Sequence, residues 1–438
     1  MQSRNWVSSD RLVPRRFVQP IVRFTETEAA SGIVLLAATI VALIWANSAW
    51  SSTYTTILEA HLTIDFLGFH LDESVLHLIN DGLMAVFFFV VGLEIKRELV
   101  LGELRDRKAA ALPVMAALGG MVFPALIYVV INSGGPAEAL RGWGIPMATD
   151  IAFAIGIVAL LGSRVPPGAK LFLLAVAIAD DIGAIAVIAI FYTDDLQVNA
   201  LIGALAGLAL VWVAARVNVR AMWFYIPMAF VIWYFTLESG VHATLAGVAL
   251  AFLTPTKPNY TPEELDQRAR AVLDQFAVDG HQEHSDYEAM ELAMVARESL
   301  SPLVRLEHAL IGWSSFVIVP LFALANAGVD FRGVDIVEMM GSSIALGVAA
   351  GLVVGKLVGI TGFTWLALRL GWGRLPPGVG MAHVAGVSAL AGVGFTVAIF
   401  ISGLAFNDPD LVDMAKLGIF AGSAVAGALG SALLMRRG

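Results

Sequence analysis

Apolar stretches of about twenty residues, the length that an α-helix needs to cross a bilayer, recur along nearly the whole of this 438-residue chain. Hydrophobic residues make up 58% of the chain and charged residues 14%, against about 25% charged residues in ordinary soluble domains. A single soluble core cannot bury so much apolar surface. The sequence therefore predicts an all-α protein that crosses a membrane many times.

Hydropathy predicts twelve transmembrane spans. The seventh and eighth are short and lie close together in the sequence. The predicted spans are residues 31–50, 76–99, 110–132, 143–161, 168–192, 199–215, 222–236, 240–254, 303–327, 343–367, 383–406 and 413–435.

Lysine and arginine are concentrated on alternate connections between these spans. One side of the membrane carries 23 of the 27 basic residues, and the opposite side holds only Arg141 and Arg332. Since cytoplasmic connections carry the excess of basic residues, both termini are predicted in the cytoplasm, beginning with residues 1–30. No convincing cleavage site follows the first apolar run, so we expect that run to stay in the membrane.

Charge and cysteine content exclude several classes of function. A net charge of -9 argues against nucleic acid as a partner, because binding phosphates needs a basic surface. The chain has no cysteine, which excludes disulfides, iron–sulfur clusters and thiolate zinc sites.

Two connections have a character of their own. Residues 55–75, on the predicted outer face, contain a β-rich pattern on both sides of Leu67 and Gly68, which fits either a β-hairpin or a plain loop. Residues 256–299 form an acidic cytoplasmic loop in which apolar spacing predicts one amphipathic helix. His281 and His284 lie there without a third ligand in a fixed local pattern, so we interpret them as solvated residues rather than a metal site.

Two adjacent aspartates, Asp180 and Asp181, lie in the middle of the fifth span. An ionised carboxylate at that depth costs at least ~3 kcal/mol, even on the lenient insertion scales. A pair of carboxylates there predicts a functional site on the path of something that crosses the membrane.

The fourth and eleventh spans are interrupted by Gly and Pro, which weaken a continuous helix. Ser, Thr and Asp in the same segments, Thr396 among them, offer local hydrogen bonds to a freed backbone. Non-helical backbone at membrane depth survives only when it is buried in protein or lines a cavity. Each broken span is the second of three in the units 110–192 and 343–435. This arrangement predicts two repeats of three spans with a binding site at the breaks, as in secondary transporters.

Lys356 lies near the middle of the tenth span, where an ammonium group needs a buried partner. Asp81, Asp150, Asp180 and Asp181 are the candidate carboxylates.

Neighbouring residues on a helix point about 100° apart, so Asp180 and Asp181 are poorly placed to share one proton as a dyad. One of them can pair with Lys356 while the other faces a water-filled cavity. Na+ or Li+ could bind to the carboxylates together with the Thr149 hydroxyl, because hard cations prefer oxygen ligands. A proton and a cation would then compete for the same oxygens, which is the minimum machinery for exchange.

Two other interpretations remain open at this point. An intramembrane aspartyl protease would need carboxylates facing each other from two helices, for which Asp150 and Asp181 are candidates. A cation channel would give uncoupled ionic currents, and the lysine near the carboxylates argues against it.

The sequence resembles the NhaA family of bacterial sodium/proton antiporters over nearly its whole length. The resemblance rests on residues 80–88, 91–99, 148–154, 179–184, 239–247, 305–308 and 323–328.

The resemblance implies twelve spans in inverted three-helix repeats, with the fourth and eleventh helices unwound where they cross near the midplane. Asp150 and Lys356 would compensate the helix dipoles at the crossing. Asp180, Asp181 and Thr149 would bind Na+ or Li+, with Asp180 bonded to Lys356 in one state. Transport would be electrogenic, by alternating access, without a cofactor, and would regulate intracellular pH and sodium.

The resemblance also implies a pH-sensing cluster at a cytoplasmic funnel. Val304 and Ile311 stand where the family's pattern has Lys and His. The matching residues are Glu94, Arg97, Glu98, His242, Glu307 and His308.

Finally, the resemblance implies a location in the bacterial inner membrane and a homodimer that pairs through the periplasmic hairpin.

Overall fold

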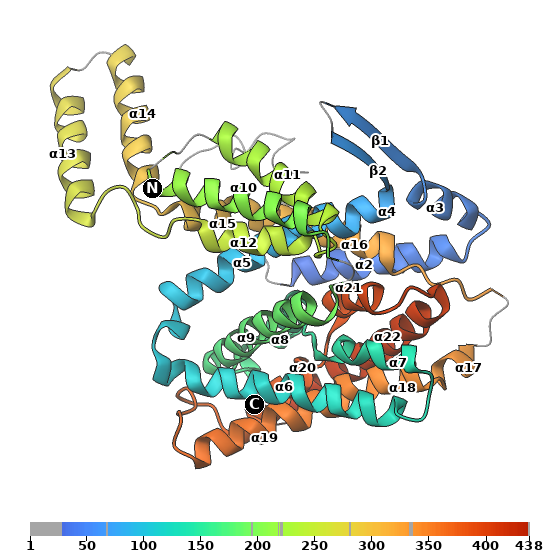
Figure 1. Cartoon of the computed structure of the whole chain (residues 1–438). Helices are drawn as coiled ribbons and strands as arrows, with labels where there is room; N and C mark the ends of the chain where they lie inside the picture. Colours follow the sequence, from blue (N-terminus) through green and yellow to red (C-terminus); the bar gives the residue numbers. More distant parts are fainter. Residues whose placement is uncertain are drawn as a thin grey trace, which may run out of the picture. The chain divides into compact units, whose positions relative to one another are not determined.

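The computed structural model describes residues 29–66, 69–193, 196–217, 219, 222–279, 282–332 and 336–436. The basic N-terminal segment up to residue 28, the hairpin tip at Leu67 and Gly68, and His281 lie outside the described residues. The chain forms two compact units (Figure 1). The first comprises Met1–Met84, Glu103–Asp194 and Ser315–Gly438, and the second comprises Ala85–Gly102 and Asp195–Ser314.

The first unit holds both interrupted spans, and where the structure describes it, its elements are helices apart from one pair of strands. Its elements are α2 (Ala30–Ala46), α3 (Ser51–Leu58), β1 (His61–Phe66), β2 (Phe69–Ser74), α4 (Val75–His77), η3 (Leu78–Leu83), η4 (Glu103–Arg105), α6 (Arg107–Asn132), α7 (Ala137–Leu140), η5 (Arg141–Met147), α8 (Ile151–Leu161), η6 (Gly162–Arg164), α9 (Pro167–Phe191), α16 (Val319–Asn326), α17 (Ile336–Met340), α18 (Ser343–Ala350), η8 (Gly351–Gly355), α19 (Lys356–Arg369), α20 (Met381–Leu390), α21 (Phe395–Ala405) and α22 (Pro409–Met435).

The elements in the described residues of the second unit are all helices. Two elements, α5 and η7, run across the boundary between the units. The elements are α5 (Met84–Val100), α10 (Val198–Arg216), α11 (Met222–Glu238), α12 (Thr244–Leu253), α13 (Pro262–Asp279), α14 (Gln282–Glu298), α15 (Pro302–Trp313) and η7 (Ser314–Ile318).

Among the described residues, seven helices are long and apolar enough to cross a membrane, and three further helix pairs pass the same test with a bend between their members. The two predicted breaks are among these pairs. The segment Ala137–Met147 meets Ile151–Arg164 at 42°, and Met381–Leu390 meets Phe395–Ala405 at 51°. The third pair is α2 with α3, bent by 112°. The predicted first span, 31–50, is therefore the helix α2 and the turn after it, and α3 follows at an angle.

Three predicted spans contain a π-helical turn that the hydropathy pattern does not reveal. These turns are η3 before α5, η7 between α15 and α16, and η8 directly before Lys356. A π turn inserts one residue into a helix and occurs frequently at functional sites. Asp81 lies inside η3, so two of these turns contain or adjoin a charged residue at membrane depth.

Helices α6 and α19 pack with their backbones in contact. A Cβ atom added to Gly119 would lie 2.2 Å from the carbonyl oxygen of Gly359, and one added to Gly359 would lie 2.1 Å from that of Gly119. Only glycine allows so close an approach. This contact fixes α19, and Lys356 at its start, against α6.

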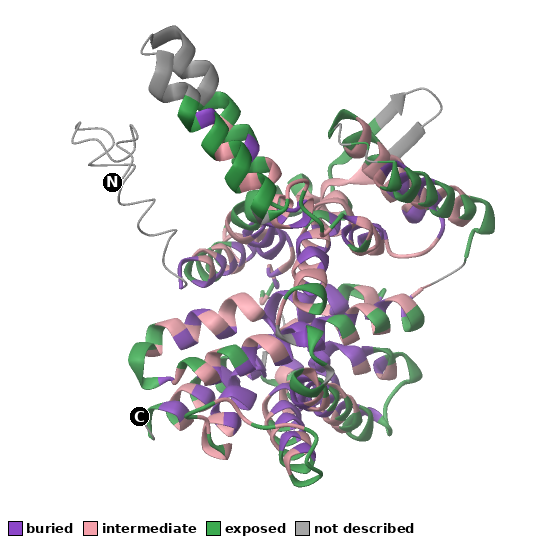
Figure 2. Cartoon of the chain, turned by 90° about the vertical axis from the view of Figure 1, so that its left-hand side faces the viewer, coloured by how far each residue is buried: buried purple, intermediate pink, exposed green. Residues whose placement is uncertain are grey.

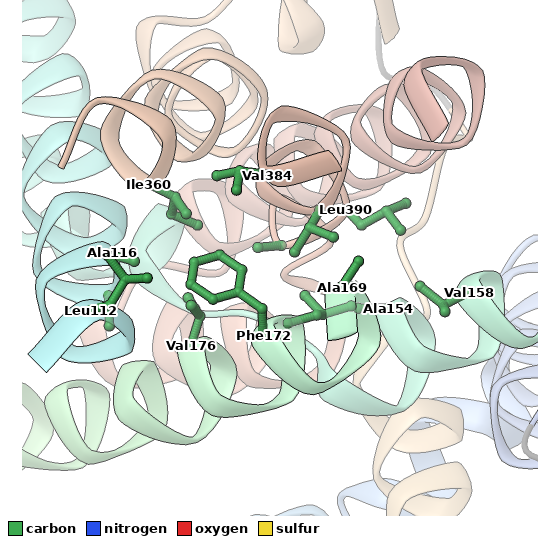
Figure 3. Packing of buried hydrophobic residues seen from close by; sticks show 14 of the residues in the cluster. Leu112, Ala116, Ala154, Val158, Ala169, Phe172, Val176, Ile360, Val384 and Leu390 are labelled. Carbon is green, nitrogen blue, oxygen red and sulfur yellow. The ribbon is translucent and has the colours of Figure 1, made fainter. Parts of the chain in front are cut away.

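An apolar cluster surrounds the half of α9 that precedes the aspartates (Figure 3). Ala169, Phe172 and Val176 of α9 are almost completely buried in this cluster. Asp180 follows Val176 by one helical turn and therefore continues the same buried stripe. The cluster also takes in residues of α6, α8, α19 and α20, including Leu112, Ala116, Ala154, Val158, Ile360, Val384 and Leu390.

The connection at residues 55–75 contains two antiparallel strands, paired from His61 opposite Ser74 to Phe66 opposite Phe69. The amide nitrogen of Val75 also donates to the carbonyl oxygen of Ala60, at 2.9 Å. Of the two structures that the sequence pattern allowed, a hairpin or a plain loop, the described residues form the two paired strands of a hairpin.

The acidic connection at 256–299 is mostly helical. It contains α13 and α14, where the sequence indicated one amphipathic helix inside a loop. Its residues are good helix formers, and Val272 and Val295 are 4% and 5% exposed, so each helix has an apolar position to bury. Most of the described side chains of the pair are exposed (Figure 2). The side chain of His284 is outside the described residues.

Candidate ion-binding site

The adjacent aspartates lie in the buried interior of the first unit, midway along α9, the 25-residue helix Pro167–Phe191. Asp180 is 2% exposed and Asp181 is 8% exposed. Charged groups are almost never buried to this degree without a partner, because leaving water costs several kcal/mol per ion. The partners of Asp180 are Thr149, at the break in the fourth span, and Lys356, in the middle of the tenth span.

Lys356 and Thr149 both contact one oxygen of Asp180. The Lys356 ammonium, which is 0% exposed, donates to Oδ2 of Asp180 and to the Thr149 hydroxyl, the latter at 3.0 Å. The Thr149 hydroxyl lies 2.7 Å from Oδ2 of Asp180 and 2.8 Å from the carbonyl oxygen of Ala391, and can donate its one hydrogen to either. Of the four candidate carboxylates, Asp180 thus forms the ion pair with Lys356.

The second oxygen of Asp180 is buried and, within the described part of the chain, has no hydrogen-bond partner. A buried carboxylate oxygen in this situation favours binding either a proton or a cation. Asp181 follows on the next residue of the helix. The Asp180 carboxylate and the Thr149 hydroxyl therefore lie together beside one lysine.

Asp150 links the two broken spans. Its side chain accepts from the amide nitrogen of Phe153 at 3.1 Å, and from the amide nitrogen and hydroxyl of Thr396 at 3.1 and 2.5 Å. These groups lie at the first turns of α8 and α21, so one carboxylate caps two helix N-termini. The amide nitrogen of Asp150 donates to the carbonyl oxygen of Val393 at 2.6 Å.

The broken spans are thus held together by their own freed backbone groups. The carbonyl oxygens of Ala391 and Val393 follow the end of α20 and accept hydrogen bonds from Thr149 and Asp150. Thr149 and Asp150 of the fourth span thus satisfy backbone groups of the eleventh, as a break at membrane depth requires.

An apolar pocket lies beside this arrangement, with a volume of about 330 Å³. Gly183, one turn beyond Asp180, lines it, but neither aspartate does. The water-filled cavity expected beside the second carboxylate therefore stays a prediction. The pocket is lined by Met121, Val122, Ala125, Leu126, Trp143, Met147, Gly183 and Val187.

No group of three or more His, Cys, Asp or Glu side chains in the described residues could hold a metal ion. The remaining membrane carboxylate, Asp81, lies in η3 and pairs with His77, with Nε2 and Oδ2 3.0 Å apart.

The second unit brings three residues of the predicted pH-sensing cluster together. Nη1 of Arg97 lies 2.6 Å from Oε1 of Glu307, and Nη2 lies 3.4 Å from Oε1 of Glu98. Glu94 is on the same helix, α5. His308 is exposed, and His242 lies just before α12.

Some contacts could not be found by reading the sequence. Thr396 was expected only to support a freed backbone, but it donates to Asp150. Lys96 donates to the carbonyl oxygens of Phe252 and Thr254 at the end of α12, at 2.6 and 2.5 Å. In both cases the sequence shows a polar side chain near a helix end. Such a side chain needs a hydrogen-bond partner, but the sequence does not show which residue that partner is.

Comparison with known proteins identifies the family of the chain. Residues 22–434 match the model of the family described as Na+/H+ antiporter 1. The chain is 45% identical over 428 residues to the Na(+)/H(+) antiporter NhaA of Oleidesulfovibrio alaskensis, covering 96% of this chain and 94% of that protein. It is 47% identical over 425 residues to that of Acidithiobacillus ferrooxidans, covering 94% and 96%, and 46% identical over 421 residues to that of Bordetella parapertussis, covering 96% and 97%.

The family model covers nearly the whole chain, and the relatives align over almost their full length, which confirms the resemblance seen in the sequence. The chain is a member of the Na+/H+ antiporter 1 family, whose members transport ions rather than catalyse reactions.

Proposed function

We propose that the protein exports Na+ or Li+ in exchange for protons at Asp180, Asp181 and Thr149, by alternating access. The observation that carries this proposal is the state of Asp180. One of its oxygens is bonded to Lys356 and Thr149, and the other is buried with no hydrogen-bond partner among the described residues. Such a carboxylate gains from either a proton or a cation, but the two compete for the same oxygens.

Lys356 gives the exchange its balance of charge. When the cation leaves, the ammonium group can neutralise Asp180, so the empty site does not hold two unpaired carboxylates at membrane depth. When a cation binds, it competes with Lys356 for the carboxylate oxygens. Inward protons in excess of outward sodium ions would make the cycle electrogenic and let it regulate intracellular pH and sodium.

The proposed topology has twelve spans. Seven long apolar helices, three bent pairs and two shorter apolar helices, Met222–Glu238 and Thr244–Leu253, support this number. We assign the units 110–192 and 343–435 as inverted repeats, because each has its broken span in the middle. The whole chain, 1–438, would act as one transport domain in the bacterial inner membrane with both termini cytoplasmic.

The remaining roles follow from position. Asp150 would compensate the N-terminal ends of α8 and α21, which its side chain caps. Lys356 would compensate the opposite helix ends. Glu94, Arg97, Glu98, Glu307, His242 and His308 would sense pH, a role supported by the ion pairs of Arg97 with Glu98 and Glu307.

A protease is disfavoured by the environment of Asp150, whose two oxygens are engaged by Phe153 and Thr396 rather than facing a second carboxylate. A channel is disfavoured by the fixed ion pair of Lys356 with Asp180. Coupled flux without single-channel currents would distinguish exchange from conduction.

The test is reconstitution in liposomes with a pH-sensitive dye. Added Na+ should collapse a preformed proton gradient, and Asp181→Asn should reduce the response to that of empty liposomes. The Na+ concentration for half-maximal response should fall as the pH is raised, because fewer protons compete for the carboxylates. Asp413→Asn is the matched control, since Asp413 is a partly exposed partner of Lys416 in α22. A full response from Asp181→Asn would refute the site.

A further inference from the structure

Two buried tyrosines hold the backbone of the half-span α7–η5, the segment that leads to Thr149. Tyr128 of α6 is 0% exposed and Tyr192 at the end of α9 is 2% exposed. A tyrosine hydroxyl that is buried in this way has to find a hydrogen-bond partner. Both hydroxyls find it in the backbone of residues 139–144.

The Tyr192 hydroxyl is inserted into the 3₁₀ helix itself. It donates to the carbonyl oxygen of Arg141 at 2.7 Å and accepts from the amide nitrogen of Gly144 at 3.2 Å. Arg141 and Gly144 are three residues apart, the spacing that a 3₁₀ turn joins by its own hydrogen bond. The tyrosine therefore bridges a turn of η5 and sets its path.

Close packing leaves the half-span little freedom around these hydroxyls. A Cβ atom on Gly144 would lie 2.7 Å from Oη of Tyr192, and one on Gly142 would lie 2.4 Å from Oη of Tyr128. Tyr128 donates to the carbonyl oxygen of Ala139 at 2.7 Å. The ring of Trp143 stacks on that of Tyr192 with the centroids 6.5 Å apart.

The same two segments meet a second time at the ion-binding site. Tyr192 lies twelve residues after Asp180, or about 18 Å along the helix axis. Thr149 lies two residues after the end of η5 and contacts Asp180 at 2.7 Å. The half-span is therefore tied to α9 at both ends, by Tyr192 and by Thr149, and its length between the two ties is fixed.

We infer that Tyr192 is a positioning residue for cation binding, acting through the half-span to place the Thr149 hydroxyl against Asp180. Tyr128 assists it from α6. Neither tyrosine touches the cation. This inference rests on the proposed function, because it assigns Thr149 to the cation site.

Tyr192→Phe should raise the apparent KM for Na+ roughly tenfold, the effect of two lost hydrogen bonds, while the rate at saturating Na+ changes less than about twofold. Tyr54→Phe is the matched control. The Tyr54 hydroxyl is also buried and bonded to backbone carbonyl oxygens, those of Leu324 and Ala325 at 2.8 and 2.9 Å, but it does not contact the half-span. Both variants should lower the melting temperature, and only Tyr192→Phe should change the KM.

Gly144→Ala is the second variant, because its Cβ would displace the Tyr192 hydroxyl. It should also raise the KM, and the double variant should show less than the product of the two single effects, as expected for residues that act through one contact. If Tyr192→Phe is not recovered as folded protein, the KM of Gly144→Ala is compared with that of Tyr54→Phe instead. A higher KM for Gly144→Ala alone supports the inference, and equal KM values overturn it.

A KM for Tyr192→Phe within twofold of the unmodified protein, or an equal shift in Tyr54→Phe, would overturn the inference. This failure is separate from failure of the proposed function, which is decided by whether the unmodified protein exchanges Na+ for protons and Asp181→Asn does not.

Discussion

At the scale of single residues, the buried ion pair of Lys356 and Asp180 sets the chemistry of the site. Both side chains are nearly inaccessible, and the lysine donates to the carboxylate and to Thr149. A pair of this kind is weak evidence for stability as a whole, but removing one partner leaves an uncompensated buried charge. The lysine is therefore required by the carboxylate that it neutralises.

Lys356→Ala should destabilise the protein by about 3–5 kcal/mol, because it strands the Asp180 carboxylate. Thermal unfolding in mild detergent measures this. The loss should shrink as the pH is lowered, since a protonated Asp180 no longer carries the stranded charge.

Lys416→Ala is the matched control for this change, because Lys416 pairs with Asp413 at 3.1 Å in a more exposed place. Exposed pairs contribute about 0–1 kcal/mol, so its melting should hardly change. Adding Asp180→Asn to Lys356→Ala should restore part of the lost stability. Unchanged melting of Lys356→Ala itself would contradict the assigned pairing.

At the scale of elements, the contact between α6 and α19 sets the position of Lys356, the first residue of α19. Gly119 and Gly359 let the two backbones touch, and a Cβ atom added to Gly120 would lie 3.7 Å from Cδ of Lys356. Just before α19, η8 packs against Pro124 of the same helix α6, because a Cβ atom on Gly355 would lie 2.6 Å from the Cα of Pro124. The lysine is held by backbone packing as well as by its charge.

Gly119→Ala should destabilise the protein by about 1–3 kcal/mol or more, since the added Cβ would overlap a backbone oxygen that cannot move without shifting α19. Gly362→Ala on the same helix is the control, as nothing lies within 4 Å of the added atom. That variant should be neutral or more stable, because alanine is the better helix former. Equal melting temperatures for the two variants would show that the helices are not in backbone contact.

At the scale of the whole molecule, the two compact units hold different parts of the proposed machinery. The first holds Asp180, Asp181, Lys356 and both broken spans, and the second holds the ion pair of Arg97 with Glu307. The two-stranded hairpin belongs to the first unit, and neither of its strands has a further partner strand among the described residues. An unpaired strand edge is a ready template for pairing with another chain.

We expect removal of residues 62–73 to convert the proposed homodimer to monomers in mild detergent. His61 and Ser74 are directly opposite each other, so a short glycine linker can rejoin them without disturbing α3 or α4. Light scattering coupled to size exclusion measures the mass. Transport should persist, because each protomer carries a complete site, and a dimer that remains tight would count against pairing through the hairpin.

The sequence alone determined the membrane environment, the family, and the residues that need partners. Long apolar runs are stable in the lipid bilayer. A charge or a broken helix inside such a run needs a partner for the charge or for the freed backbone groups. This is why Asp180, Lys356 and the breaks near Thr149 and Gly392 could be identified as a group.

Only the tertiary structure decided how those requirements are met. Four carboxylates could have accepted Lys356, and the packing of both α19 and α9 against α6 brought Asp180 to it. The polar side chains at each break could have bonded to the backbone of their own span, but Asp150 of one span bonds to Thr396 of the other. The Tyr192 bridge depends on packing between segments far apart in the chain, α9 and η5. Local residue patterns do not encode such distances, because a hydrogen-bonding group specifies the kind of partner that it needs and not the place in the fold from which that partner comes.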